Sequence, residues 1–134
     1  MLLDPGTSQD LASQARIPTR KQVELAHHFA DGLYAKETSF PAGSILVQHR
    51  HHYDHFALLA AGMVEVEVDG QRTIAHAPQL LTIRAHQHHG VKALTDVVWF
   101  CIHATDETDP AHVDEVLIER PDAAQMLAIA EGLA

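Results

Sequence analysis

The chain of 134 residues lacks the features that identify several large classes of protein. Its single cysteine excludes a framework of intrachain disulfides. It contains no apolar run near the ~20 residues that a membrane-spanning helix needs. Its first residues lack the basic segment and apolar stretch of a signal peptide. We therefore expect a cytoplasmic protein that makes no membrane contact.

Positive charge is also scarce. Lysine and arginine together number 9 against 18 acidic residues, which gives a formal net charge of −9. The imbalance is concentrated in residues 104–134, which hold eight acidic residues and one arginine. Neither part of the chain offers the basic stripe that a phosphate backbone requires, so we expect no binding to nucleic acid.

Histidine, in contrast, is abundant, with 12 copies. Three of them, His49, His51 and His55, lie in the run HRHHYDHF, and His89 follows in HQHHGVK. Residues i and i+2 of a strand point to the same face, so His49 and His51 can reach one ion together. His55 can return to that ion after a turn, and His89 can join from a distant strand. The alternative is that these are ordinary polar, core and loop histidines.

The first structured segment is predicted to be a helix from about Thr19 to Asp31. Thr19 and Gln22 fit a capping box, and Gly32 suits the helix end. Helix is expected again near the C-terminus, after Asp109-Pro110 and in the run AAQMLAIAEGLA.

Between these helices, residues 33–104 show about eight short β-rich runs separated by turn residues. The run MVEVEVDGQRTI is the clearest hairpin, because Asp69-Gly70 favours a tight turn. Such a pattern predicts a β-sandwich or small barrel. The expected organisation is an N-terminal arm and helix at 1–32, a barrel at 33–104, and an acidic helical segment at 105–134 that packs on the same domain.

The stretch Gly43–Gly62 reads G-SILVQ-H-R-H-HYD-H-FALLAA-G. It resembles the first motif of the cupins, which runs glycine, five residues, His-x-His, three or four residues, glutamate, six residues, glycine. Every spacing agrees, and the one departure is His55 in place of the glutamate. The second cupin motif is weak here, because only His89, at the metal-ligand position, is kept. The chain also resembles, more loosely, small cupin-like proteins of bacteriophage and prophage genomes.

The resemblance implies an all-β cupin jelly-roll barrel with helices added at both ends. It implies one divalent transition metal (manganese, iron, nickel, copper or zinc) held by His49, His51, His55 and His89. Four neutral imidazoles would leave more charge on the ion than a set that contains a carboxylate, which makes the ion a stronger Lewis acid. Since cupins commonly pair their barrels, a homodimer is also expected.

Further site residues follow from the strands around this motif. On the last strand, Trp99, Cys101 and His103 share one face. The resemblance to cupins, in which this strand lines the barrel, implies that this face points to the metal cavity, with His103 as a proton shuttle. Tyr53 should lie at the mouth and contact a ligand, with His88 at the rim. The small-molecule pocket is expected to be lined by Ile45, Val47, Ala57, Leu59, Trp99 and Cys101.

These residues suggest a metal-dependent oxidoreductase of dioxygenase type that acts on a small chelating organic substrate. One alternative is a non-redox isomerase or lyase acting on a sugar or keto acid, for which only His103 or Tyr53 could accept a proton. Another is a non-catalytic metal-binding or accessory domain of phage origin. Fold alone does not separate these three.

Overall fold

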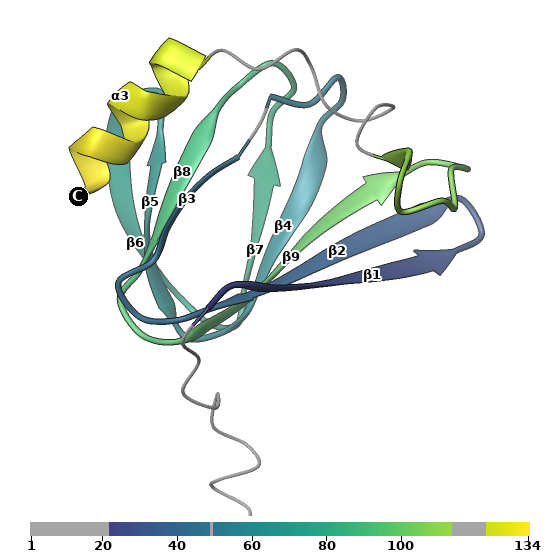
Figure 1. The fold of residues 1–134 in the computed structure, drawn as a ribbon, viewed down its shortest axis with the longest axis horizontal. Coiled ribbons are helices and arrows are strands. Elements are labelled where there is room, and N and C mark those ends of the chain that lie inside the picture. Colours follow the sequence, from purple (N-terminus) through teal and green to yellow (C-terminus); the bar gives the residue numbers. More distant parts are fainter. Residues whose placement is uncertain (1–21, 49, 114–122) are drawn as a thin grey trace, which may run out of the picture.

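Two antiparallel sheets face each other in the computed structural model, which describes residues 22–48, 50–113 and 123–134 (Figure 1). The first sheet has five strands, in the spatial order β1 (Glu24–Ala30), β2 (Leu33–Phe40), β9 (Val97–Ala104), β4 (His55–Ala61) and β7 (Gln79–Ile83). The second has four, in the order β3 (Ile45–Gln48), β8 (His89–Ala93), β5 (Met63–Val68) and β6 (Gln71–His76). This arrangement confirms the prediction of an all-β jelly roll.

All eight strands expected within residues 33–104 are present, as β2 to β9. The expected β5–β6 hairpin is there as well, with Val68 paired to Gln71. Its two turn residues, Asp69 and Gly70, have φ of 51° and 77°. Two consecutive positive φ angles match the twist of a tight hairpin, which is why the Asp-Gly pair identified it.

The predicted N-terminal helix is wrong over the residues that the structure describes, because Glu24–Ala30 forms strand β1. This strand pairs with β2 from Glu24↔Ser39 to Ala30↔Leu33, so Asp31-Gly32 is a two-residue hairpin turn, with Gly32 at φ 68°. β1 lies at the sheet edge and only Ala26 and Phe29 are half-buried, a three-residue spacing that imitates a helical stripe. The Asp-Gly pair was the contrary signal.

The main core lies between the two sheets, and β9 shows how the sequence builds it. Its residues alternate strictly, with Val97, Trp99, Cys101 and His103 buried and the residues between them half-buried. Trp99 is 1% exposed and packs in one cluster with Leu59 and other apolar side chains from both sheets. The inner face of β9 is therefore interior from one end of the strand to the other.

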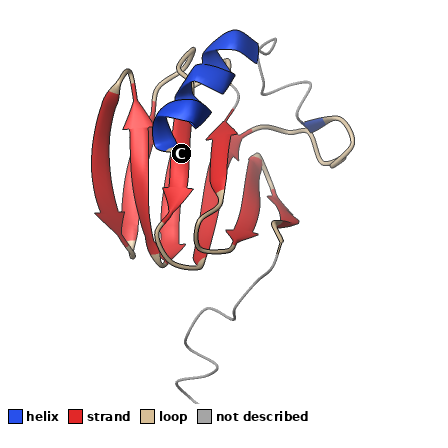
Figure 2. Ribbon diagram, turned by 60° about the vertical axis from the view of Figure 1, so that its left-hand side comes forward, coloured by secondary structure: helices blue, strands red, loops and turns tan. Residues whose placement is uncertain are grey.

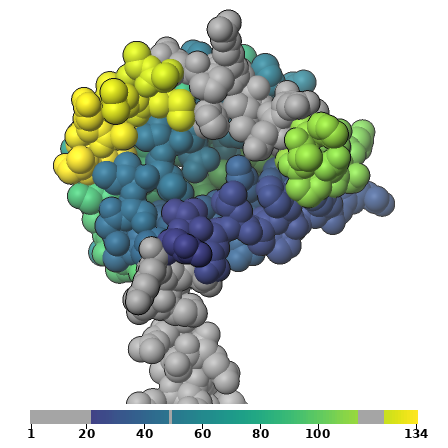
Figure 3. Space-filling view, viewed as in Figure 1, coloured from purple at the N-terminus to yellow at the C-terminus, as the bar shows by residue number. Residues whose placement is uncertain are grey.

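The predicted C-terminal helix is present as α3 (Ala123–Leu133), which lies over the outer side of the four-stranded sheet (Figure 2). In the space-filling view it covers one shoulder of the molecule, on the side opposite the segment at 105–113 (Figure 3). Among the described residues, no helix has the length and apolarity needed to cross a membrane.

The helix rests on a glycine of β8. A Cβ atom at Gly90 would lie 2.5 Å from Cγ2 of Ile129 and 2.6 Å from Cδ1 of Leu133, both on α3. Gly90 pairs with Val47, so Val47, and with it Ile45, points toward the helix side of the sheet. The prediction that Ile45 and Val47 line an interior pocket is therefore wrong.

We expect Gly90→Ala to displace α3 and to lower the free energy of unfolding by about 1–3 kcal/mol, the usual cost of overpacking. Thermal or urea unfolding measures this change. Leu127→Ala is the matched control, since Leu127 lies on the same helix with 60% of its side chain exposed, and its effect should stay within about 0.5 kcal/mol. A Gly90→Ala protein as stable as the original would contradict this account of the helix contact.

Candidate metal centre

Three histidines converge inside one end of the barrel. His51 lies in a short bridge beyond β3, His55 begins β4, and His103 is near the end of β9. One ring nitrogen from each lies within 4.8 Å of the other two. The ring centroids are 4.3 Å apart for His55 and His103, and 4.5 and 4.6 Å from His51 to each of these. All three side chains are buried.

Sheet pairing brings two of these histidines together. β4 and β9 are antiparallel neighbours with Phe56 opposite Ile102, so His55 and His103 lie on the inner face at the same end of the sheet. Neither residue depends on a loop for its position. The alternation of buried residues along 97–104 indicates that His103 faces inward. The pairing of β4 with β9 is what brings it beside His55.

His51 is held by a clasp between two rim segments. Its carbonyl accepts a hydrogen bond from the His86 amide at 2.9 Å. The Asp54 carboxylate accepts one from the Ala85 amide at 2.7 Å and one from the Arg84 guanidinium at 3.2 Å. These hydrogen bonds, the Ala85 amide first, lower the pKa of Asp54 below its usual range. The clasp fixes the turn that carries His51 against the loop that precedes β8.

His89 lies close to this cluster but outside the group of three. It is completely buried, with its ring centroid 6.2 Å from that of His55 and 6.3 Å from Trp99, against which it stacks. Both ring nitrogens of His89 and both of His55 are buried and have no hydrogen-bond partner. A buried polar group left without a partner costs about 1–3 kcal/mol. Four such atoms in one place are therefore better suited to an ion than to an empty interior.

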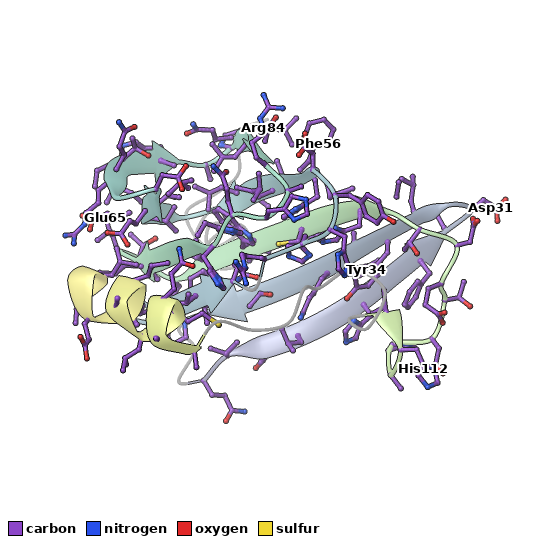
Figure 4. All side chains as sticks on the ribbon, turned by 90° about the horizontal axis from the view of Figure 1, so that it is seen from above. Asp31, Tyr34, Phe56, Glu65, Arg84 and His112 are labelled. Carbon is purple, nitrogen blue, oxygen red and sulfur yellow. The ribbon has the colours of Figure 1, made fainter. Side chains whose placement is uncertain are left out.

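Tyr34 of β2, labelled in Figure 4, packs against the cluster at His103. Its ring stacks on His103 with centroids 6.1 Å apart, and its hydroxyl is hydrogen-bonded to Nδ1 of His27 at 2.7 Å. Tyr34 forms a small second core with Val113 and Phe29, so the segment after β9 covers it. The His103 ring is thus held between Tyr34 and the other two histidines.

Burial sets the charge state of the cluster. Desolvation, followed by the neighbouring histidines, lowers the pKa of His55 and of His89 to about 3 and that of His103 to about 2. Neutral imidazole is the form that binds a metal, so the lone pairs are available near pH 7. Desolvation also raises the pKa of the Cys101 thiol to about 11, so this residue stays protonated beside the cluster.

Of the four metal ligands predicted from the sequence, the structure brings two into the cluster. His51 and His55 are in the cluster, His89 lies beside it, and His49 falls outside the described residues. His103, expected to be a proton shuttle, lies in the group of three histidines that could hold an ion. His88 is not at the rim as predicted, since it is 3% exposed and its Nδ1 is hydrogen-bonded to the Gln48 carbonyl at 3.0 Å.

The predicted pocket residues that do face the interior belong to the packed core. Ala57, Leu59, Trp99 and Cys101 are all buried and pack together as core, whereas Tyr53 is 62% exposed near His52. A cavity of about 350 Å³ lies elsewhere, at the mouth. Its polar lining consists of Asp54, His55, Thr82 and His103, and its apolar lining of Leu33, Phe56, Ile102 and Ala104.

The chain is similar to cupins both in its sequence pattern and in its structure. The model of the cupin domain family matches residues 36–103. A cupin superfamily protein from Desulfitobacterium hafniense is similar in structure, with a TM-score of 0.58 and 20% identity over 72% of this chain and 88% of that one. A cupin 2 domain-containing protein from Halorhodospira halophila gives 0.60 and 18%, over 87% and 84%. KdgF from a Halomonas species gives 0.57 and 17%, over 71% and 90%. A search of the curated proteins finds no match.

The lowered histidine pKa values predict acid sensitivity of the metal-free protein. The unfolded chain binds protons at these histidines near pH 6.5, whereas the folded chain does so only near pH 3. Stability is therefore complete above about pH 6.5 and falls with pH below it, by up to about 1.4 kcal/mol per pH unit for each histidine. Urea unfolding of chelator-treated protein at stepped pH measures the slope.

His55→Phe is the matched variant, since it keeps a buried ring and removes one titrating group. Its stability should fall less steeply with acid than that of the original chain. Equal slopes for the two proteins would mean that His55 is not buried as a neutral imidazole.

Proposed function

The chain belongs to the cupin family, and from this premise we propose that it binds one divalent transition metal through His51, His55 and His103. His89 stands beside them as a fourth imidazole. The observation that carries the proposal is that the buried ring nitrogens of His55 and His89 have no hydrogen-bond partner, beside the point where His51, His55 and His103 meet. The donor set fits manganese, iron, nickel, copper or zinc, all of which accept imidazole ligands.

The proposed activity is that of an oxidoreductase of dioxygenase type on a small chelating organic substrate. An octahedral ion held by three or four imidazoles would keep coordination positions open, which a catalytic site requires and a closed structural site lacks. When bound, the ion would supply Lewis acidity and one-electron chemistry to oxygen donors placed on those positions. The neighbouring cavity of about 350 Å³ reaches His55 and His103, so a ligand in it would lie against the ion.

The chain's own residues favour this reaction over an isomerase or lyase, which needs a proton acceptor beside the substrate. His103 lies within the cluster, where its ring nitrogen would be taken up by the proposed ion. Tyr53 is largely exposed on the rim. Asp54 does line the cavity, but its two oxygens accept hydrogen bonds from Ala85 and Arg84. No acceptor among the described cavity residues is therefore both unengaged and close to the cluster.

Metal content tests the ligand set directly. We expect about one equivalent of a transition metal in protein purified without added metal, and His103→Phe should lower the affinity at least about 10–100-fold, since even loss of an outer-sphere partner has an effect of that size. Elemental analysis after dialysis measures it. His51→Ala should behave alike, whereas His76→Ala, an exposed histidine at the end of β6, should keep its metal. Full metal content in His103→Phe would remove His103 from the ligand set.

The reaction class is tested by exchanging the ion. Catechol, a bidentate oxygen chelator, is a suitable first probe, together with small 2-oxo acids. Protein loaded with iron or manganese should consume dioxygen in the presence of an accepted chelator, and protein loaded with zinc should not, because zinc has no redox chemistry. An oxygen electrode records the rate, with the His103→Phe protein as the inactive control. Turnover of a 2-oxo acid or sugar that is as fast with zinc would instead support the non-redox alternative.

A further inference from the structure

The cavity beside the candidate metal centre is lined from both faces of the same two strands. On β4, His55 borders it from the inner face and Phe56 from the outer face. On β9, His103 and Ile102 stand in the same relation. Phe56, Thr82 and Ile102 form a row on the outer face, so the cavity lies on the outer side of the five-stranded sheet, at the end that carries His55 and His103. It therefore borders the strand positions that hold two histidines of the cluster.

The outer part of this cavity is apolar and accessible. Phe56 is 48% exposed and Leu33 is 51% exposed. Phe56 pairs with Ile102 on one side and with Thr82 on the other, so these side chains stand in one row across three strands. In Figure 4, Phe56 projects from β4 away from the interior in which Tyr34 lies. Apolar surface of this kind gains free energy when a ligand covers it.

Charge and size restrict what can occupy the cavity. Asp54 is the only carboxylate among the described residues that line it, and an aspartate carries a negative charge at neutral pH. A second anionic group on a ligand would be repelled there. The volume of about 350 Å³ is at the small end of the 300–1,000 Å³ usual for ligand pockets. Both limits favour a small ligand with an uncharged tail.

We propose that the outer part of this cavity binds the apolar tail of a small ligand whose oxygen-donor head reaches the histidine cluster. The ligand class is a monocarboxylic acid, or a similar single-headed oxygen donor, with a short aliphatic or aromatic tail. The position of the head rests on the proposed metal function, whereas the tail site rests on the cavity alone.

Two series of simple ligands separate these parts. Ethanol, butanol and hexanol probe the tail site in metal-free protein, and acetate, butyrate and hexanoate probe head and tail together in metal-loaded protein. Affinities are measured by NMR titration. In both series each added methylene should raise the affinity by about fourfold until the cavity is full. The carboxylates should also gain affinity on metal loading, which the alkanols should not.

The variants follow from the row of outer residues. Phe56→Ala should flatten the dependence on chain length, and Thr82→Phe should abolish it by filling the cavity. Neither position is buried, so both proteins should fold. Leu80→Ala is the matched control, because Leu80 is 56% exposed on the same outer face of β7 but does not line the cavity. It should bind both series as the original protein does.

The outcomes are distinguishable. Affinity that does not depend on chain length in either series, or that responds equally to Phe56→Ala and Leu80→Ala, overturns the tail site. Chain-length dependence without any gain from metal loading upholds the tail site and overturns the placement of the ligand head at the ion, whereas failure to load metal at all would overturn the proposed metal centre. A third outcome is that the face is covered by a second copy of the chain. Sedimentation would then show a dimer that Phe56→Ala dissociates, with no binding of either series, and the proposal would be wrong.

Discussion

The burial of several imidazoles at one end of the barrel is the constraint on which the rest of the structure depends. Isolated from water, His55 and His89 each leave two ring nitrogens without a hydrogen-bond partner, a cost that folding must meet from other contacts. A protein gains nothing from this arrangement unless something else binds those nitrogens. A transition metal would do so and would also favour the neutral state that burial enforces. The cluster thus links stability, charge state and proposed function in one group of atoms.

Contacts from several segments of the surrounding structure fix the positions of these rings. Strand pairing places His55 and His103, because β4 and β9 are adjacent along their length. The Asp54 clasp holds the turn that carries His51, and Tyr34 supports His103 from behind. These contacts come from separate segments, so the histidine geometry depends on the whole barrel end and not on one loop. Ligands that are fixed before an ion arrives are what tight and selective metal binding needs.

Much of this could be predicted from the sequence, and the failures have physical causes. Strands β2 to β9 follow from alternation and turn residues, and the cupin spacing identified His51 and His55. The face of β3 was predicted wrongly because the strand was assumed to continue through His51, whereas it ends at Gln48. A change of one residue in register exchanges the two faces of a strand. The place of His103 in the histidine cluster could not be foreseen, because it depends on which strands become neighbours.

The alternation that obscured those assignments also organises the site. His55 and Phe56 are consecutive, as are Ile102 and His103, yet in each pair one side chain faces the cluster and the other the outer surface. The proposed metal ligands and the residues proposed to contact a ligand's tail are therefore interleaved on the same two strands. Substitution on the outer face would change what the cavity accepts without altering the donor atoms, because the strand backbone separates the two sets. A barrel built in this way would vary its ligand while keeping its metal, which is consistent with one fold serving proteins of different function.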